Sequence, residues 1–217
     1  MIRPNLKKGS PPPTDFMMDI FNELCPGKDY TNGIDLQVAE ILPDPRTLKT
    51  HLPLSLLPPT VIDTSKVVYV IRNPKDVIIS WHHFVRIAKI MNYKGSFEDF
   101  VQFFIDGDML YGPYCKHVRE AWEKRTHPNV HILFYENLKS NIMEELRKLN
   151  AFLETKCTEG QLQNIAEYTT FENMKRRDDK WDAERPQPRV LNLSPQEQER
   201  ERKRRAVVEA EGGFYRK

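Results

Sequence analysis

The chain has 217 residues, of which 39% are hydrophobic, enough for the core of one α/β domain. Its formal net charge of +2 argues against nucleic acid as a partner, and its apolar stretches are far shorter than the roughly 20 residues that span a bilayer. Three widely spaced cysteines, Cys25, Cys115 and Cys157, form no CxxC pair. This disfavours a zinc site or a disulfide framework and predicts a cytoplasmic protein.

The first elements follow a polar, proline-rich leader at residues 1–14, which lacks the apolar core of a secretory signal. Apolar residues four apart predict a short helix over 16–24. Residues 47–51 are extended in character. The run KVVYVI at 66–71 predicts a strand of a parallel sheet that is buried on both faces.

A helix is expected directly after this strand, with Asn73 as the N-cap and Pro74 at the first helical position. Further helices are predicted over 96–107, 113–124 and 141–154, and a second buried strand covers 131–135. Ser96 and Asp99 have the spacing of a capping box, and Thr158 and Gln161 cap another helix. Alternating strands and helices predict a three-layer α/β fold with a central parallel sheet. Ligands of such sheets bind beyond the carboxyl ends of the strands.

Two basic constellations lie where such a ligand would bind. Arg72 ends the first strand before a helix N-terminus, and Ser80 follows Asn73 by two helical turns, so together they could hold an anion. The alternative is a plain strand–turn–helix with a solvated arginine. Lys49 and His51 would share one face of an extended segment, where His51 could take a proton and Lys49 could stabilise a transferring anionic group. The alternative is a surface lysine and a partly buried histidine.

Two aromatic positions also qualify as candidates. Tyr135, at the end of the second predicted strand, could stack on a base or simply close the core. Thr169 and Phe171, at a helix boundary, could hold the edge and face of an adenine. The alternative for this pair is an N-cap and a core phenylalanine.

Four segments in this order resemble the signature blocks of the cytosolic sulfotransferases: KTHLPLSLLP, YVIRNPKDVIISWHHF, HILFYENLK and TTFENMK. The resemblance covers roughly residues 45–174. It implies a fold like that of the P-loop NTPases and transfer of a sulfuryl group from 3′-phosphoadenosine 5′-phosphosulfate to a hydroxyl or amine of a small acceptor. No metal, nucleic acid or membrane is implied.

The resemblance also implies a role for each candidate residue. His51 resembles the catalytic base and Lys49 the lysine beside the sulfuryl group. The remaining residues resemble contacts of the donor: Arg72 and Ser80 with the 3′-phosphate, Tyr135, Thr169 and Phe171 with the adenosine, and the C-terminal Arg216 and Lys217 again with the 3′-phosphate.

Two family segments have no counterpart in the sequence. Before Asp15 nothing resembles the loop Pro-Lys-Ser-Gly-Thr-Thr-Trp that cradles the 5′-phosphosulfate, and after Lys217 the glycine-rich block and the usual dimer segment are missing. We therefore expect residues 15–217 to form a single, incomplete sulfotransferase domain without its first strand, in which a homodimer is possible. One alternative is an impaired member that at most binds the nucleotide. Another is an unrelated module with a basic tail at 200–205, although interleaved glutamates favour a solvated face there.

Overall fold

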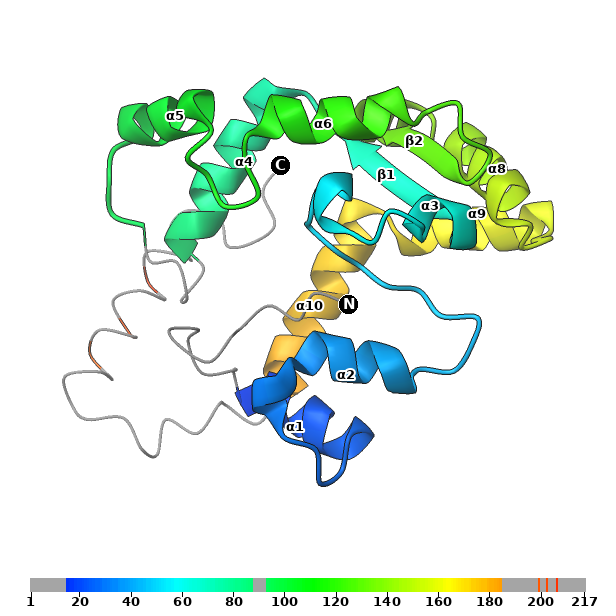
Figure 1. Ribbon diagram of the computed structural model, residues 1–217, viewed down its shortest axis with the longest axis horizontal. Coiled ribbons are helices and arrows are strands. Elements are labelled where there is room, and N and C mark those ends of the chain that lie inside the picture. Colours follow the sequence, from blue (N-terminus) through cyan, green and yellow to red (C-terminus); the bar gives the residue numbers. More distant parts are fainter. Residues whose placement is uncertain (1–14, 88–92, 185–198, 200–201, 203–205, 207–217) are drawn as a thin grey trace. The chain divides into compact units, whose positions relative to one another are not determined.

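The computed structural model describes residues 15–87, 93–184, 199, 202 and 206 (Figure 1). Contacts divide the chain into two compact units, Met1–His51 and Leu52–Lys217. The expectation of a single domain over 15–217 stays a prediction. Among the described residues, no helix is long and apolar enough to cross a membrane.

The first unit is helical. It contains α1 (Asp15–Leu24), the short 3₁₀ helix η1 (Tyr30–Asn32) and α2 (Ile34–Ile41), and Phe21 and Cys25 are buried. The helix predicted over 16–24 is confirmed. Residues 47–51 carry no strand pairing, so their extended character is that of an irregular segment rather than a strand.

The second unit contains the sheet, in which β1 (Val67–Ile71) and β2 (Val130–Phe134) run parallel. Their register pairs Val67 with Val130 and Ile71 with Phe134. The predicted strands and their parallel arrangement are therefore confirmed. The second strand ends one residue earlier than predicted, because Tyr135 already belongs to the helix that follows.

Helices cover both faces of this sheet, which confirms the three-layer arrangement (Figure 1). On one face, the Tyr69 hydroxyl lies 2.5 Å from Nδ1 of His117 in α6 (Tyr114–Glu123). On the other face, the ring of His131 stacks on Phe152 of α8 (Ile142–Leu153), with 5.1 Å between centroids. Tyr69 and His131 point to opposite faces because the register pairs His131 with Val68, the neighbour of Tyr69.

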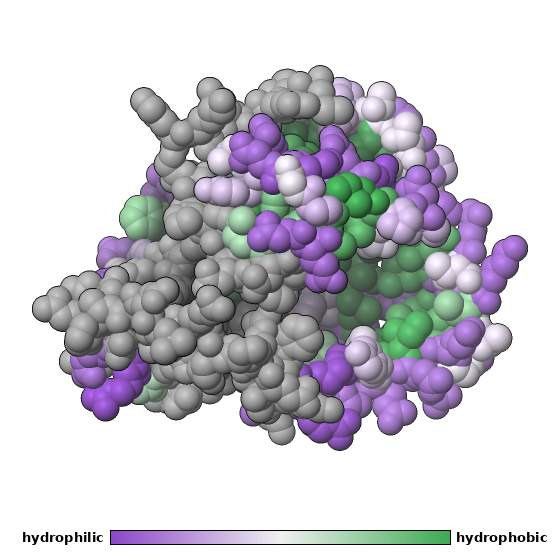
Figure 2. Space-filling view, turned by 90° about the horizontal axis from the view of Figure 1, so that it is seen from below, coloured by the Kyte–Doolittle hydropathy of each residue, from purple (hydrophilic) through white to green (hydrophobic). Residues whose placement is uncertain are grey.

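The prediction that β1 is buried on both faces is wrong. Val68 and Val70 are 37% and 55% exposed, and they share the face on which α8 packs against β2. An apolar run indicates that its side chains can be buried. Whether they are buried depends on which elements pack over each face of the strand. Apolar groups consequently reach the surface between hydrophilic ones (Figure 2).

Three of the predicted helices are α4 (Pro74–Ile87), α5 (Phe97–Asp106) and α9 (Glu159–Tyr168), and α10 (Phe171–Glu184) begins at the expected helix boundary. The structure adds three short helices that the sequence did not predict, η2 (Leu54–Leu56), α3 (Val61–Thr64) and α7 (Tyr135–Ser140). The predicted capping boxes are present, with Ser96 and Asp99 on α5 and Thr158 and Gln161 on α9. Gly107 ends α5 in the left-handed conformation, which glycine adopts without strain.

Neighbouring phenylalanines on α5 provide a test of the core. Phe104 is 8% exposed and packs on Tyr114, whereas Phe103 is 45% exposed. We expect Phe104→Ala to lower the free energy of unfolding by about 3–5 kcal/mol, since it removes buried area and leaves a cavity. Phe103→Ala, the matched control, should cost much less. Urea denaturation measures both, and equal losses would contradict the assigned face of α5.

Candidate functional site

The carboxyl edge of the sheet brings two predicted site residues into contact. Arg72 follows β1 and Tyr135 follows β2, and the guanidinium carbon of Arg72 lies 4.4 Å from the centre of the Tyr135 ring. The pairing of Ile71 with Phe134 makes the two residues the next pair along the sheet. A cation over a tyrosine ring is a favourable arrangement, so the ring holds the guanidinium at this edge.

The environment of Arg72 suits an anion. Its Nε is buried and has no hydrogen-bond partner among the described residues. An arginine stays charged in a protein, and a buried donor without a partner carries a desolvation cost that an incoming acceptor removes. The N-terminus of α4 begins two residues later, where Oδ1 of Asn73 accepts from the Lys75 N–H at 3.0 Å and confirms the predicted N-cap. Charge and helix dipole therefore favour negative charge at this place.

Two side chains hold the peptide group between Arg72 and Asn73. The Asn73 N–H donates to Oε1 of Glu136 at 2.8 Å, and the hydroxyl of Tyr114 donates to the Arg72 carbonyl. The pKa of Glu136 lies below its ordinary value, because the Asn73 N–H and its own backbone N–H donate to the carboxylate, with the charge of Arg72 adding to this. Glu136 is therefore ionised at neutral pH.

A second set of polar side chains lies on the face of β1 that α6 covers. The Tyr69 hydroxyl contacts His117, and Glu120 accepts a hydrogen bond from the Ser55 backbone N–H at 3.2 Å. Burial raises the pKa of the Tyr69 and Tyr114 hydroxyls, and for Tyr69 the nearby Tyr114 and Glu120 add to the shift. Both phenols therefore remain protonated donors far above neutral pH.

Ser80, Thr169 and Phe171 occupy separate helical positions. Ser80 is exposed on α4, about two turns from Asn73. The Thr169 hydroxyl donates to the Ile165 carbonyl at 2.8 Å and so caps the end of α9, while the hydroxyl of Thr170 receives the Asn173 N–H of α10. The alternative interpretation of this helix boundary as an N-cap is therefore confirmed, with Thr170 as the capping residue. Phe171, half-buried, begins α10.

Lys49 and His51 are exposed and belong to the first unit. Their predicted position opposite Arg72 stays a prediction. Arg216 and Lys217 lie outside the described residues, as does most of the basic segment 200–205.

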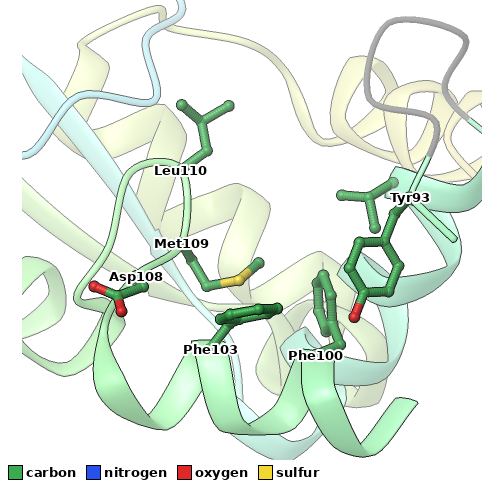
Figure 3. A pocket seen from close by; sticks show the side chains of 7 residues that line it. Tyr93, Phe100, Phe103, Asp108, Met109 and Leu110 are labelled. Carbon is green, nitrogen blue, oxygen red and sulfur yellow. The ribbon is translucent and has the colours of Figure 1, made fainter. Parts of the chain in front are cut away.

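A hollow of about 270 Å³ lies beside α4 and α5 in the second unit (Figure 3). Phe100 and Phe103 from α5 and Met109 and Leu110 from the following loop supply its apolar side chains; Val85, Tyr93 and Asp108 complete the lining. An aromatic cluster supports this wall, since the ring of His82 lies within 5.1–5.9 Å of the rings of Phe97, Phe100 and Tyr93.

The sequence had not singled out Tyr114, Glu136 or the residues that line the hollow. Glu136 follows Tyr135 at a strand end, a position that could have identified it. Tyr114 reaches the site only because α6 packs over β1, so no local signal in the sequence identifies it.

Comparison with known proteins places this geometry in a family. The family model for the sulfotransferase domain matches residues 21–210 of this chain. Sulfotransferase 1A1 of Rattus norvegicus is 42% identical over 153 residues, which are 70% of this chain and 51% of that protein, and sulfotransferase 1A1 of Mus musculus is 43% identical over the same shares. The chain spans about half the length of these relatives.

Solved structures agree with these relatives. Mouse sulfotransferase SULT7A1 complexed with PAP, which is 3′-phosphoadenosine 5′-phosphate, has a TM-score of 0.62 at 28% identity over 74% of this chain and 61% of that one. Retinol dehydratase in complex with androsterone and PAP has a TM-score of 0.59 at 32% identity over 74% and 51%. The sheet, the helices and these likenesses define a sulfotransferase fold. The chain belongs to the cytosolic sulfotransferase family.

The buried phenols can be followed by their ionisation. The pKa of Tyr69 and Tyr114 is raised above the unfolded value of 10.0, so their contribution to stability is present below pH 10 and is lost as the pH rises through the folded-state pKa. We expect tyrosinate absorbance at 295 nm to rise in two steps, with the later step accompanying unfolding. The double variant Tyr69→Phe, Tyr114→Phe should reduce the later step. A single step near pH 10 in the folded protein would contradict the buried environment.

Proposed function

We propose that this protein transfers a sulfuryl group from 3′-phosphoadenosine 5′-phosphosulfate to a hydroxyl or amine of a small acceptor. The observation that carries the proposal is Arg72, held on Tyr135 at the carboxyl edge of the sheet with a buried Nε directed to no described partner. Family membership supports the proposal, and PAP is present in the related sulfotransferase and retinol dehydratase structures.

The residues of this edge fit the nucleotide. Arg72, with Ser80 on the following helix, would hold the 3′-phosphate, since a guanidinium pairs with phosphate oxygens through charge-assisted hydrogen bonds. Tyr135, Thr169 and Phe171 would contact the adenosine, and Arg216 and Lys217 would add charge to the phosphate site. When bound, the donor supplies the sulfuryl group: an acceptor oxygen or nitrogen gains a bond to sulfur as the bond to the phosphate oxygen breaks.

His51 and Lys49 carry the proposed chemistry of the chain itself. An imidazole titrates near neutrality, so neutral His51 would accept the proton that the acceptor releases. The ammonium of Lys49 would offset the negative charge that develops around the transferred group. This division of roles needs no protein-bound metal.

The hollow beside α5 supports a small apolar acceptor. Its wall consists mainly of aromatic and aliphatic side chains, with Asp108 as the charged residue of the lining. Such a pocket buries the body of an apolar ligand and leaves few polar groups to orient it. Androsterone and retinol, which occupy the related retinol dehydratase structures, are molecules of this kind. We therefore propose an apolar acceptor that bears a hydroxyl or amine.

We also propose a cytoplasmic location, which the three free thiols Cys25, Cys115 and Cys157 support. A homodimer stays a prediction.

Loss of the base should abolish transfer without loss of nucleotide binding. With 3′-phosphoadenosine 5′-phosphosulfate and a simple phenol as substrates, we expect His51→Ala to lower the turnover rate at least about a hundredfold. Its affinity for 3′-phosphoadenosine 5′-phosphate, measured by calorimetry, should stay unchanged. The control is His127→Ala, because His127 lies just before β2 and pairs with Asp63 at 3.4 Å. Full activity in His51→Ala would refute the proposed base.

Loss of the anion-binding arginine should weaken nucleotide binding, which loss of the base leaves unchanged. We expect Arg72→Ala to weaken binding of 3′-phosphoadenosine 5′-phosphate by about 10- to 100-fold, the worth of one or two charge-assisted hydrogen bonds. Arg125→Ala is a matched control, because it removes the same charge and Arg125 also lies over an aromatic ring, 4.6 Å from the centre of Trp122. Saturable binding without turnover in the unaltered chain would favour the alternative of a nucleotide-binding member that does not transfer sulfate.

A further inference from the structure

The peptide group between Arg72 and Asn73 is fixed from both sides by side chains that are distant in sequence. Its carbonyl accepts a hydrogen bond from the hydroxyl of Tyr114, the first residue of α6. Its N–H donates a hydrogen bond to Glu136 in the first turn of α7. A strand end followed by a helix start normally leaves such groups to water or to a cap. Here the two side chains fix the plane of the peptide.

The fixed plane bears directly on the guanidinium. The side-chain rotamers available to Arg72 depend on its backbone φ and ψ, and the fixed peptide that follows restricts ψ. The guanidinium then lies on Tyr135, the residue before Glu136, so one helical turn supplies both the supporting ring and the carboxylate. Part of the conformational freedom of a long side chain is thereby removed before any ligand arrives.

Glu136 does this at an electrostatic disadvantage. A carboxylate beside an anion site repels the ligand that Arg72 attracts, yet Glu136 remains ionised because backbone N–H groups donate to it. Its value for the site therefore lies in the hydrogen bond it accepts rather than in its charge. A glutamine can accept the same hydrogen bond without the charge.

We propose that Tyr114 and Glu136 are positioning residues for Arg72, which they orient through the Arg72–Asn73 peptide so that the guanidinium selects nucleotides bearing a 3′-phosphate. The proposal rests on the proposed role of Arg72 in binding that phosphate. Neither residue needs to touch the ligand.

The experiment compares two nucleotides that differ only in this group, 3′-phosphoadenosine 5′-phosphate and adenosine 5′-monophosphate, by calorimetry on the full chain. Tyr114→Phe keeps the ring that packs on Phe104 and removes only the hydroxyl. We expect it to weaken the first nucleotide about three- to tenfold, the worth of one hydrogen bond, and to leave the second unchanged. A general loosening of the fold would weaken both nucleotides alike and would refute the proposal.

Two further variants sharpen the test. Glu136→Ala should reduce discrimination between the nucleotides, whereas Glu136→Gln should restore it to at least the original level, since the amide oxygen can accept the Asn73 N–H without repelling phosphate. Tyr69→Phe, the control, removes a hydroxyl on the same face of the sheet that bonds His117 instead of Arg72. It should leave discrimination unchanged.

The outcomes separate this proposal from the function on which it rests. If the unaltered chain does not prefer the 3′-phosphorylated nucleotide, or if Arg72→Ala keeps that preference, then the role of Arg72 is wrong and both proposals fall. If Arg72→Ala abolishes the preference while Tyr114→Phe and Glu136→Ala retain it, then only the positioning role is refuted.

Discussion

The charge of Arg72 at the end of β1 is the constraint around which the site is organised. A guanidinium that is partly removed from water needs partners, and this one has a ring beneath it and a buried Nε without a described acceptor. Its surroundings hold the backbone and the ring but leave donor capacity open. That arrangement is what an anion-binding site requires before its ligand arrives, because the cost of orienting the cation is met during folding.

The parallel register makes this arrangement possible. Because Ile71 pairs with Phe134, the next residues on each strand, Arg72 and Tyr135, leave the sheet side by side. A slip of one residue would turn every side chain of a strand to the other face and would separate the ring from the guanidinium. Tyr69 contacts α6 on one face of the sheet and His131 stacks on α8 on the other, so different helices cover the two faces.

Aromatic packing shapes the other part of the site. The cluster of His82, Phe97 and Phe100 places α4 against α5, and the loop after Gly107 then supplies the remaining apolar wall of the hollow. An apolar hollow and an anion-binding edge in the same unit are consistent with the proposed transfer from a charged donor to an apolar acceptor. The exposed Val68 and Val70 show that the same chain also leaves apolar sheet surface uncovered.

Local chemistry is what the sequence determined by itself. The capping boxes at Ser96 and Thr158, the N-cap at Asn73 and the β-branched run of β1 each act over a few residues, and all were predicted correctly. Arg72 and Tyr135 could be proposed because strand ends of parallel sheets meet at one edge. Only the tertiary structure decided that Tyr114 reaches Arg72 and that β1 is open on one face, because both depend on how helices pack over strands far away in the sequence. Packing of this kind leaves no periodicity or spacing in the local sequence by which it could be recognised.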